Sequence, residues 1–211
     1  MHLSLVGSGK PRCDGRIDVH PALHLSVVAP CQRVRVPVVN PATAVVPCAA
    51  RSGLRAGLIA ADAALASGRV TVHDRGLALG AARLGPGRRS AHEAVRLADA
   101  GSESPGESWS RLVFAQLRLP RPRLQAEIRD DSGRFVAQVD FLFEEPRIVV
   151  EFDGLIQYAG WHGRDALAAE KTREDGLRRL GYVVVRLKWA DLRDPARVRT
   201  ILRDAWRVVA A

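Results

Sequence analysis

The sequence has few cysteines and few lysines, and it lacks a long apolar run. Its 3 cysteines, Cys13, Cys31 and Cys48, have no CxxC spacing, which argues against a disulfide framework and a zinc site. No apolar run approaches the roughly 18–20 residues that span a membrane. Residues 1–13 also lack the apolar stretch of a secretory signal. We therefore expect a cytoplasmic protein without a membrane partner.

Charge is distributed unevenly along the chain of 211 residues, whose formal net charge is +9 at pH 7. Residues 1–100 hold 13 Arg and Lys against 6 Asp and Glu, whereas residues 101–211 hold 19 against 17. A basic excess suits a polyanionic partner such as DNA. It equally fits a solvated surface in an Arg-rich sequence, since only Lys10, Lys171 and Lys188 are lysines.

The first part of the chain predicts a small, mostly helical domain with a few short strands. Valines alternate with polar or small residues in 32–39 and predict a strand there. An Ala-rich stretch, 41–96, predicts several short helices, one of which is capped by Thr71. The small, polar segment 99–108 (DAGSESPGES) then predicts a domain boundary.

The pattern after this boundary predicts an α/β domain over residues 101–211, which follows a first domain of residues 1–100. Its expected order is a helix, three strands, a helix, a strand and a helix, which indicates a mixed sheet flanked by helices. The expected helices are 105–119, 164–180 and 195–209, and the expected strands are 124–128, 135–143, 147–153 and 182–188.

Three carboxylates interrupt the apolar strands in QVDFLFEEPRIVVEFD, residues 138–153. If the loop 144–147 closes a hairpin, paired residue numbers sum to 291, and Asp140 lies opposite Glu151. Their β-carbons would then be about 4.5–5.5 Å apart, on the face that also carries Asp153. Such like charges repel unless a cation binds between them, and converging carboxylates suit a hard divalent cation such as Mg²⁺.

Each of these acids also has a structural interpretation. Asp153 and the glycine after it form a common turn at a strand end, and Glu151 could protect an edge strand as an inward charge. Glu107 occupies the third helical position of a capping box, SPGE, and for this residue alone the cap is the favoured interpretation. For Asp140 and Glu151, which face each other in an apolar hairpin, a functional site is favoured.

The stretches VDFLF and IVVEFDG, joined by a short turn and followed by a helix and GYVVVRLKW, resemble the PD-(D/E)XK nuclease superfamily. The branch of very-short-patch-repair-type endonucleases is the most similar, and SESPGESWSRLVFAQLRLPRP resembles the first core helix of that group. The resemblance covers about residues 102–192 and implies a restriction-endonuclease-like sheet over 102–211. The Ala-rich region before it is more weakly similar to abortive-infection antitoxin-related proteins.

The resemblance implies metal-dependent hydrolysis of DNA phosphodiesters with Mg²⁺ or Mn²⁺. It implies that Asp140 and Glu151 hold the metal, and that Glu107 is the accessory acid of the first helix. Asp153 stands where the usual pattern has lysine. Relatives with an EFDG-type motif often carry a lysine shortly afterwards, and here that position is Gln157.

Several basic residues are further candidates for the site. Lys171 is either a displaced substitute for the missing lysine or part of a solvated helix surface. Arg111, Arg164 and Arg173 are candidate DNA-phosphate contacts, and each could equally be a surface arginine. Three interpretations stay open: a nuclease, a catalytically eroded nuclease fold that binds DNA or a partner protein, and a fragment whose upstream DNA-reading module is absent.

Overall fold

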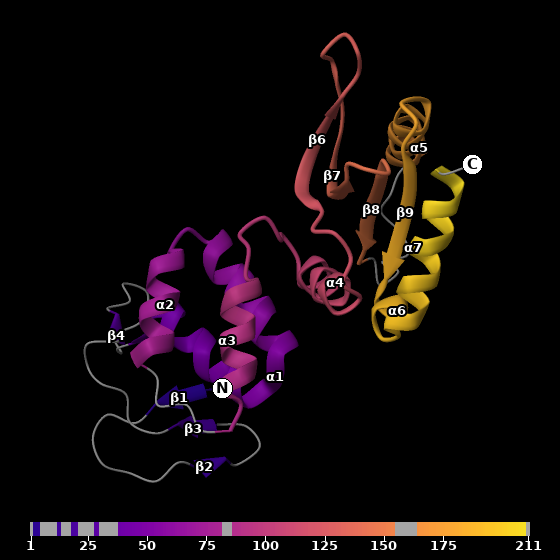
Figure 1. The fold of residues 1–211 in the computed structure, drawn as a ribbon. Helices are drawn as coiled ribbons and strands as arrows, with labels where there is room; N and C mark the ends of the chain where they lie inside the picture. The colour runs from indigo at the N-terminus through magenta and orange to yellow at the C-terminus, as the bar shows by residue number, and fades with distance from the viewer. Residues whose placement is uncertain are drawn as a thin grey trace. The chain divides into compact units, whose positions relative to one another are not determined.

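The computed structural model divides into two compact units, Met1–Arg96 and Leu97–Ala211 (Figure 1). The division falls just before the polar segment 99–108, in which the sequence places the domain boundary. The structure describes residues 2–4, 12–13, 18–20, 28–29, 38–81, 86–154 and 164–209.

The first unit is mostly helical in its described part. Thr71 caps the second of its helices, because its Oγ1 accepts a hydrogen bond from the Asp74 N–H at 3.1 Å, as the sequence predicts. Of the strand expected at 32–39, only the last two residues are described, and they form a strand. The strands are β1 (His2–Ser4), β2 (Arg12–Cys13), β3 (Asp18–His20), β4 (Val28–Ala29) and β5 (Val38–Val39), and the helices are α1 (Pro41–Ala66), α2 (Val72–Ala81) and α3 (Arg88–Leu97).

Helix α1 is the one helix in the described part of the chain that is long and apolar enough, by length and composition, to cross a membrane. Gly53 interrupts it with a non-helical backbone, φ 85° and ψ 173°. A β-carbon at Gly57 would lie only 2.2 Å from that of Ala49, so the two halves of α1 pack closely across the break. Each half is well below the roughly 20 residues that span a bilayer.

The second unit is an α/β domain built on a four-stranded mixed sheet, and this coarse fold prediction is confirmed. The strand order is β6-β7-β8-β9; β6, β7 and β8 are antiparallel, whereas β8 and β9 are parallel. A short helix, α6, follows β9 and was not expected. The elements are α4 (Pro105–Gln116), β6 (Arg123–Arg129), β7 (Phe135–Phe143), β8 (Ile148–Asp153), α5 (Arg164–Arg179), β9 (Val183–Lys188), α6 (Trp189–Leu192) and α7 (Pro195–Val209).

Two clusters of buried apolar side chains hold this sheet to its helices. One joins the sheet to α4 and α7 and includes Phe114, Phe141 and Leu202. The other joins it to α5 and includes Val139 and Leu177. Along β7, the odd-numbered side chains change from the second cluster at Val139 to the first at Phe141, while Leu142 belongs to the second, and Asp140 lies at that change.

The β7–β8 hairpin has the register that the sequence predicts. Phe143 pairs with Ile148 and Phe141 with Val150, so that paired numbers sum to 291. This pairing ends at Phe141 and Val150, whereas β8 continues to pair with β9 as far as Asp153. The two strands thus separate at a point that we call the β7–β8 fork, where Asp140 and Glu151 are the first residues beyond the last pair.

Candidate functional site at the β7–β8 fork

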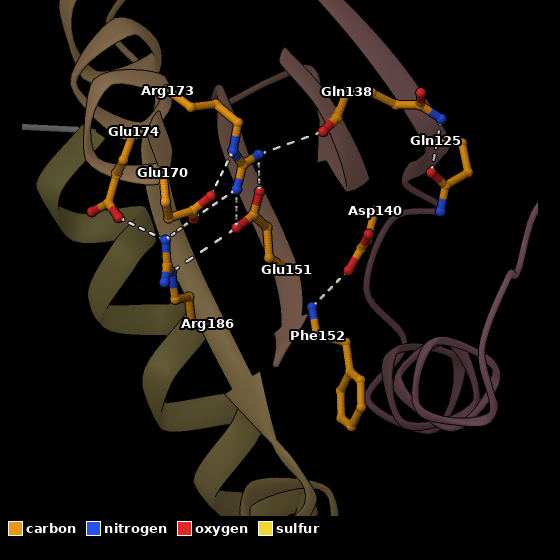
Figure 2. Close-up of polar contacts among 9 residues, drawn as sticks. All are labelled: Gln125, Gln138, Asp140, Glu151, Phe152, Glu170, Arg173, Glu174 and Arg186. Atoms are coloured by element: carbon orange, nitrogen blue, oxygen red, sulfur yellow. Dashed lines mark hydrogen bonds and ion pairs between the residues drawn. The ribbon is translucent and has the colours of Figure 1, made fainter. Parts of the chain in front are cut away.

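Asp140 stabilises the β7–β8 fork through its side chain. Because β7 leaves β8 here, the Phe152 N–H has no strand partner in β7, and it donates instead to Asp140 Oδ2 at 2.8 Å (Figure 2). Partial burial is the main cause that raises the pKa of the Asp140 carboxyl, to about 6. The Phe152 N–H opposes the rise, and the negative charges of Glu107 and Glu151 add to it.

Glu107 combines a capping position with a place near the fork. Its N–H donates to Ser104 Oγ at 3.1 Å, which confirms the predicted N-cap. Its Oε2, however, accepts from the Glu103 N–H at 2.9 Å rather than completing the box at Ser104. The same oxygen accepts a hydrogen bond from Gln125 Nε2 at 3.0 Å, and the side chain is buried. Glu107 therefore takes part in the cap of α4 and also lies close enough to Asp140 for its charge to act on that carboxyl.

Gln125 is a site residue that the sequence did not reveal. It lies across from Asp140, between the paired residues of β6 and β7, with φ 47°. This left-handed conformation is uncommon for a residue other than glycine, and such strain often marks functional positions. Its amide links Glu107 to Gln138, since Gln138 Nε2 donates to Gln125 Oε1 at 3.0 Å (Figure 2).

Glu151 is bound by an arginine of helix α5. Arg173 donates from Nη1 to Glu151 Oε1 at 2.6 Å and from Nη2 to Glu151 Oε2 at 2.9 Å (Figure 2). Arg173 also donates to both oxygens of Glu170, at 2.8 and 3.0 Å. Arg186 of β9 binds Glu170 and Glu174, and its Nε lies 3.9 Å from Glu151 Oε2. These hydrogen bonds, the one to Glu151 first, raise the pKa of the Arg173 guanidinium, which therefore stays charged.

Lys171 and Arg111 are not the residues that bind Glu151. Lys171 is exposed, and a helix turns it roughly 200° from Arg173, so the arginine and not the lysine contacts Glu151. Arg111 donates to Ser102 Oγ at 3.1 Å and to the Leu97 carbonyl, and thus fixes the segment before α4.

Three predicted positions have less structural detail. Asp153 ends β8 and is half-buried, with Lys188 beside it in the parallel register. Gln157 lies outside the described residues, and Arg164 is described only as the first residue of α5. Among the described residues, no group of three or more His, Cys, Asp or Glu side chains is arranged to hold a metal ion.

The first turn of α4 packs directly on the fork. A β-carbon at Gly106 would lie 1.9 Å from the Phe152 ring, so only glycine fits at this contact. On its other side the Phe152 ring packs edge-to-face on Trp189, with centroids 4.8 Å apart. Phe152 therefore joins the helix that carries Glu107 to the strand position that holds Asp140.

Comparison with known proteins identifies relatives without a described activity. The chain is 33% identical over 139 residues to two uncharacterized proteins from two strains of Mycobacterium tuberculosis. The match covers 65% of this chain and 49% of each relative, so the chain spans about half the length of the relatives that it matches. No family model and no solved structure matches the chain.

Proposed function

We propose that the chain is a metal-dependent DNA endonuclease of the PD-(D/E)XK type, with its site at the β7–β8 fork. The observation that carries the proposal is the half-buried Asp140, whose pKa is raised while Glu107 and Glu151 add negative charge around it. A divalent cation relieves such repulsion, and raised pKa values of this kind gather at functional sites.

The side chains of Glu107, Asp140 and Glu151 are carboxylates, and carboxylate oxygens are the preferred ligands of a hard divalent cation such as Mg²⁺ or Mn²⁺. Asp140 Oδ1 and Glu107 Oε1 accept no hydrogen bond from a described residue and are free to turn toward an ion. Glu151 joins them only after it exchanges Arg173 for the ion. When bound, the cation supplies Lewis acidity toward a phosphate oxygen and an attacking water.

The protein's own groups supply the remaining requirements of phosphodiester hydrolysis. Arg173 is a permanent cation next to Glu151, and once released from that residue it can bind a DNA phosphate through two parallel hydrogen bonds. This phosphate contact is the role that the sequence suggests for Arg173, and the same guanidinium would supply the positive charge that the sequence suggests for Lys171. Gln125 and the backbone of Phe152 hold Glu107 and Asp140 in position.

Plasmid nicking tests the proposal. We expect the wild type to nick supercoiled DNA with Mg²⁺ or Mn²⁺, and Asp140→Asn to lower the rate by roughly 10²-fold or more. Asp131→Asn is the matched control, because this exposed turn residue loses the same charge away from the fork. Absence of nicking by the wild type with either metal, or equal rates for wild type and Asp140→Asn, would contradict the proposal.

A second candidate function follows from the ion pair of Glu151. A nuclease fold in which Arg173 holds this acid permanently, and in which Asp153 replaces the lysine, would bind DNA or a partner protein without cutting. The antitoxin-like resemblance of residues 41–100 favours such a regulatory protein. Duplex binding by the wild type in Mg²⁺, without nicking under any metal, would support this candidate over the first.

A further inference from the structure

The divalent ion of the proposed function, on which this inference rests, and the guanidinium of Arg173 would both bind Glu151. Arg186 is a weaker neighbour of this carboxylate, since its Nε lies 3.9 Å from Glu151 Oε2 and it makes no hydrogen bond to Glu151. We propose that Arg173 competes with the metal ion for Glu151, and that Glu170 retains the guanidinium when the metal displaces it. Arg173 would thus set the metal affinity of the site.

The geometry makes the two occupants of Glu151 mutually exclusive. The guanidinium donates to both oxygens of Glu151 in a bidentate pair. A divalent ion can take the same position on these oxygens only after the guanidinium has left. The pair is largely shielded, since the Glu151 side chain is 14% exposed and that of Arg173 is 27% exposed. Salt therefore screens this attraction less than it screens a surface ion pair.

Glu170 gives Arg173 a second position that is already formed. It lies one turn before Arg173 on helix α5 and accepts from Arg173 Nε and Nη2 at 3.0 and 2.8 Å. Because both residues belong to the same helix, this contact does not depend on the sheet. The guanidinium can leave Glu151 without losing its only carboxylate, and it cannot leave by deprotonation.

Calorimetric titration with Mn²⁺ of the full chain, without DNA, tests the competition. Arg173→Gln removes the competing charge and should raise the Mn²⁺ association constant by about tenfold or more, since a charge in contact with Glu151 is lost. Arg173→Lys keeps the charge without the bidentate fork and should give a smaller rise. Arg178→Gln is the matched control, because Arg178 lies on the same helix and pairs with Glu174 rather than Glu151.

A second pair of variants tests the role of Glu170, and here the Mn²⁺ affinity is expected to fall rather than rise. Glu170→Gln weakens the alternative position, so that Arg173 holds Glu151 more firmly and the Mn²⁺ affinity should fall. Glu174→Gln removes the same charge one turn away, from a residue that binds Arg186 and not Arg173, and it should have the smaller effect. Far-ultraviolet circular dichroism and melting curves establish that each variant is folded.

The outcomes separate this inference from the proposed function. Asp140-dependent Mn²⁺ binding by the wild type, with no gain in Arg173→Gln or an equal gain in Arg178→Gln, overturns the inference and leaves the metal site in place. Binding by Arg173→Gln when the wild type shows none supports the inference strongly. No binding by either protein overturns both proposals. If Arg173→Gln does not fold, Arg173→Lys decides by the same criteria.

Discussion

At the scale of a single residue, the Asp140 carboxylate has both a stabilising and a destabilising effect on the fold. Its carboxylate closes the β7–β8 fork by accepting the Phe152 N–H, and it is half-buried with Glu107 and Glu151 close enough to raise its pKa. A neutral side chain of the same shape would keep the hydrogen bond without the repulsion. Residues that cost stability in this way are often kept for function.

This balance predicts how the stability of the metal-free protein changes with pH. The pKa of Asp140 rises from 3.8 to about 6 on folding, so the folded chain binds this proton more tightly than the unfolded chain does. The Asp140 carboxyl therefore costs the fold least below about pH 4, where it is protonated in both states. As the pH rises through 6, its ionisation lowers the free energy of unfolding. Asp140→Asn should be more stable than the wild type at pH 7, by on the order of 1 kcal/mol after solvent screening of a half-buried group.

Urea unfolding at a series of pH values between 4 and 7.5, in EDTA, measures this difference. The gain from Asp140→Asn should grow across the range and level off above about pH 7. The charges that face Asp140 are Glu107, Glu151 and Arg173, and none of them is changed in this variant. A gain that is constant with pH would show that Asp140 titrates at its ordinary value.

The sequence predicts which acids reach the fork but not what binds them. The hairpin arithmetic predicts that Asp140 and Glu151 pair directly. The structure has the predicted register, but its strand pairing ends at Phe141 and Val150, one position before the two acids. Which residue of helix α5 meets Glu151 depends on how that helix is rotated about its axis on the sheet. Local spacing does not encode this rotation, so the sequence suggests Lys171 for a position where the structure has Arg173.

At the scale of the elements, contacts among two helices, α4 and α5, and three strands, β6, β7 and β8, build the candidate site. Helix α4 contributes Glu107, and the close approach of Gly106 to the Phe152 ring sets its distance from β8. Strand β6 contributes Gln125, whose position opposite Asp140 was not predictable from the turn, because a register shift falls between Ile128 and Arg129. Long-range packing of this kind leaves no periodic signal in the sequence.

The contact of α4 with β8 predicts that a single added methyl group lowers the free energy of unfolding. Gly106→Ala places a methyl group inside the Phe152 ring, so the helix or the ring must move, and we expect a loss of about 1–3 kcal/mol in the free energy of unfolding. Gly76→Ala is the control, since this glycine in helix α2 has open space for a methyl group and should gain up to about 1 kcal/mol. Equal melting temperatures for the two variants would contradict the close contact.

At the scale of the whole molecule, the chain joins a mostly helical unit to an α/β unit. The order of helices and strands in the second unit follows from its periodic patterns and turn residues, which are local signals. Most of the first 37 residues lie outside the described part, and the sequence there offered only short β-like pieces. The net charge of +9 suits a DNA partner, but it does not distinguish cutting from binding.

Mn²⁺ binding by the purified chain tests the central claim, a metal site at the β7–β8 fork, most directly. Electron paramagnetic resonance of free Mn²⁺, measured at increasing protein concentration, counts the bound ions. We predict binding of about one Mn²⁺ per chain that is lost in Asp140→Asn and kept in Asp131→Asn, because only the first removes a ligand at the β7–β8 fork. Mn²⁺ binding that Asp140→Asn leaves unchanged would contradict a metal site at the fork.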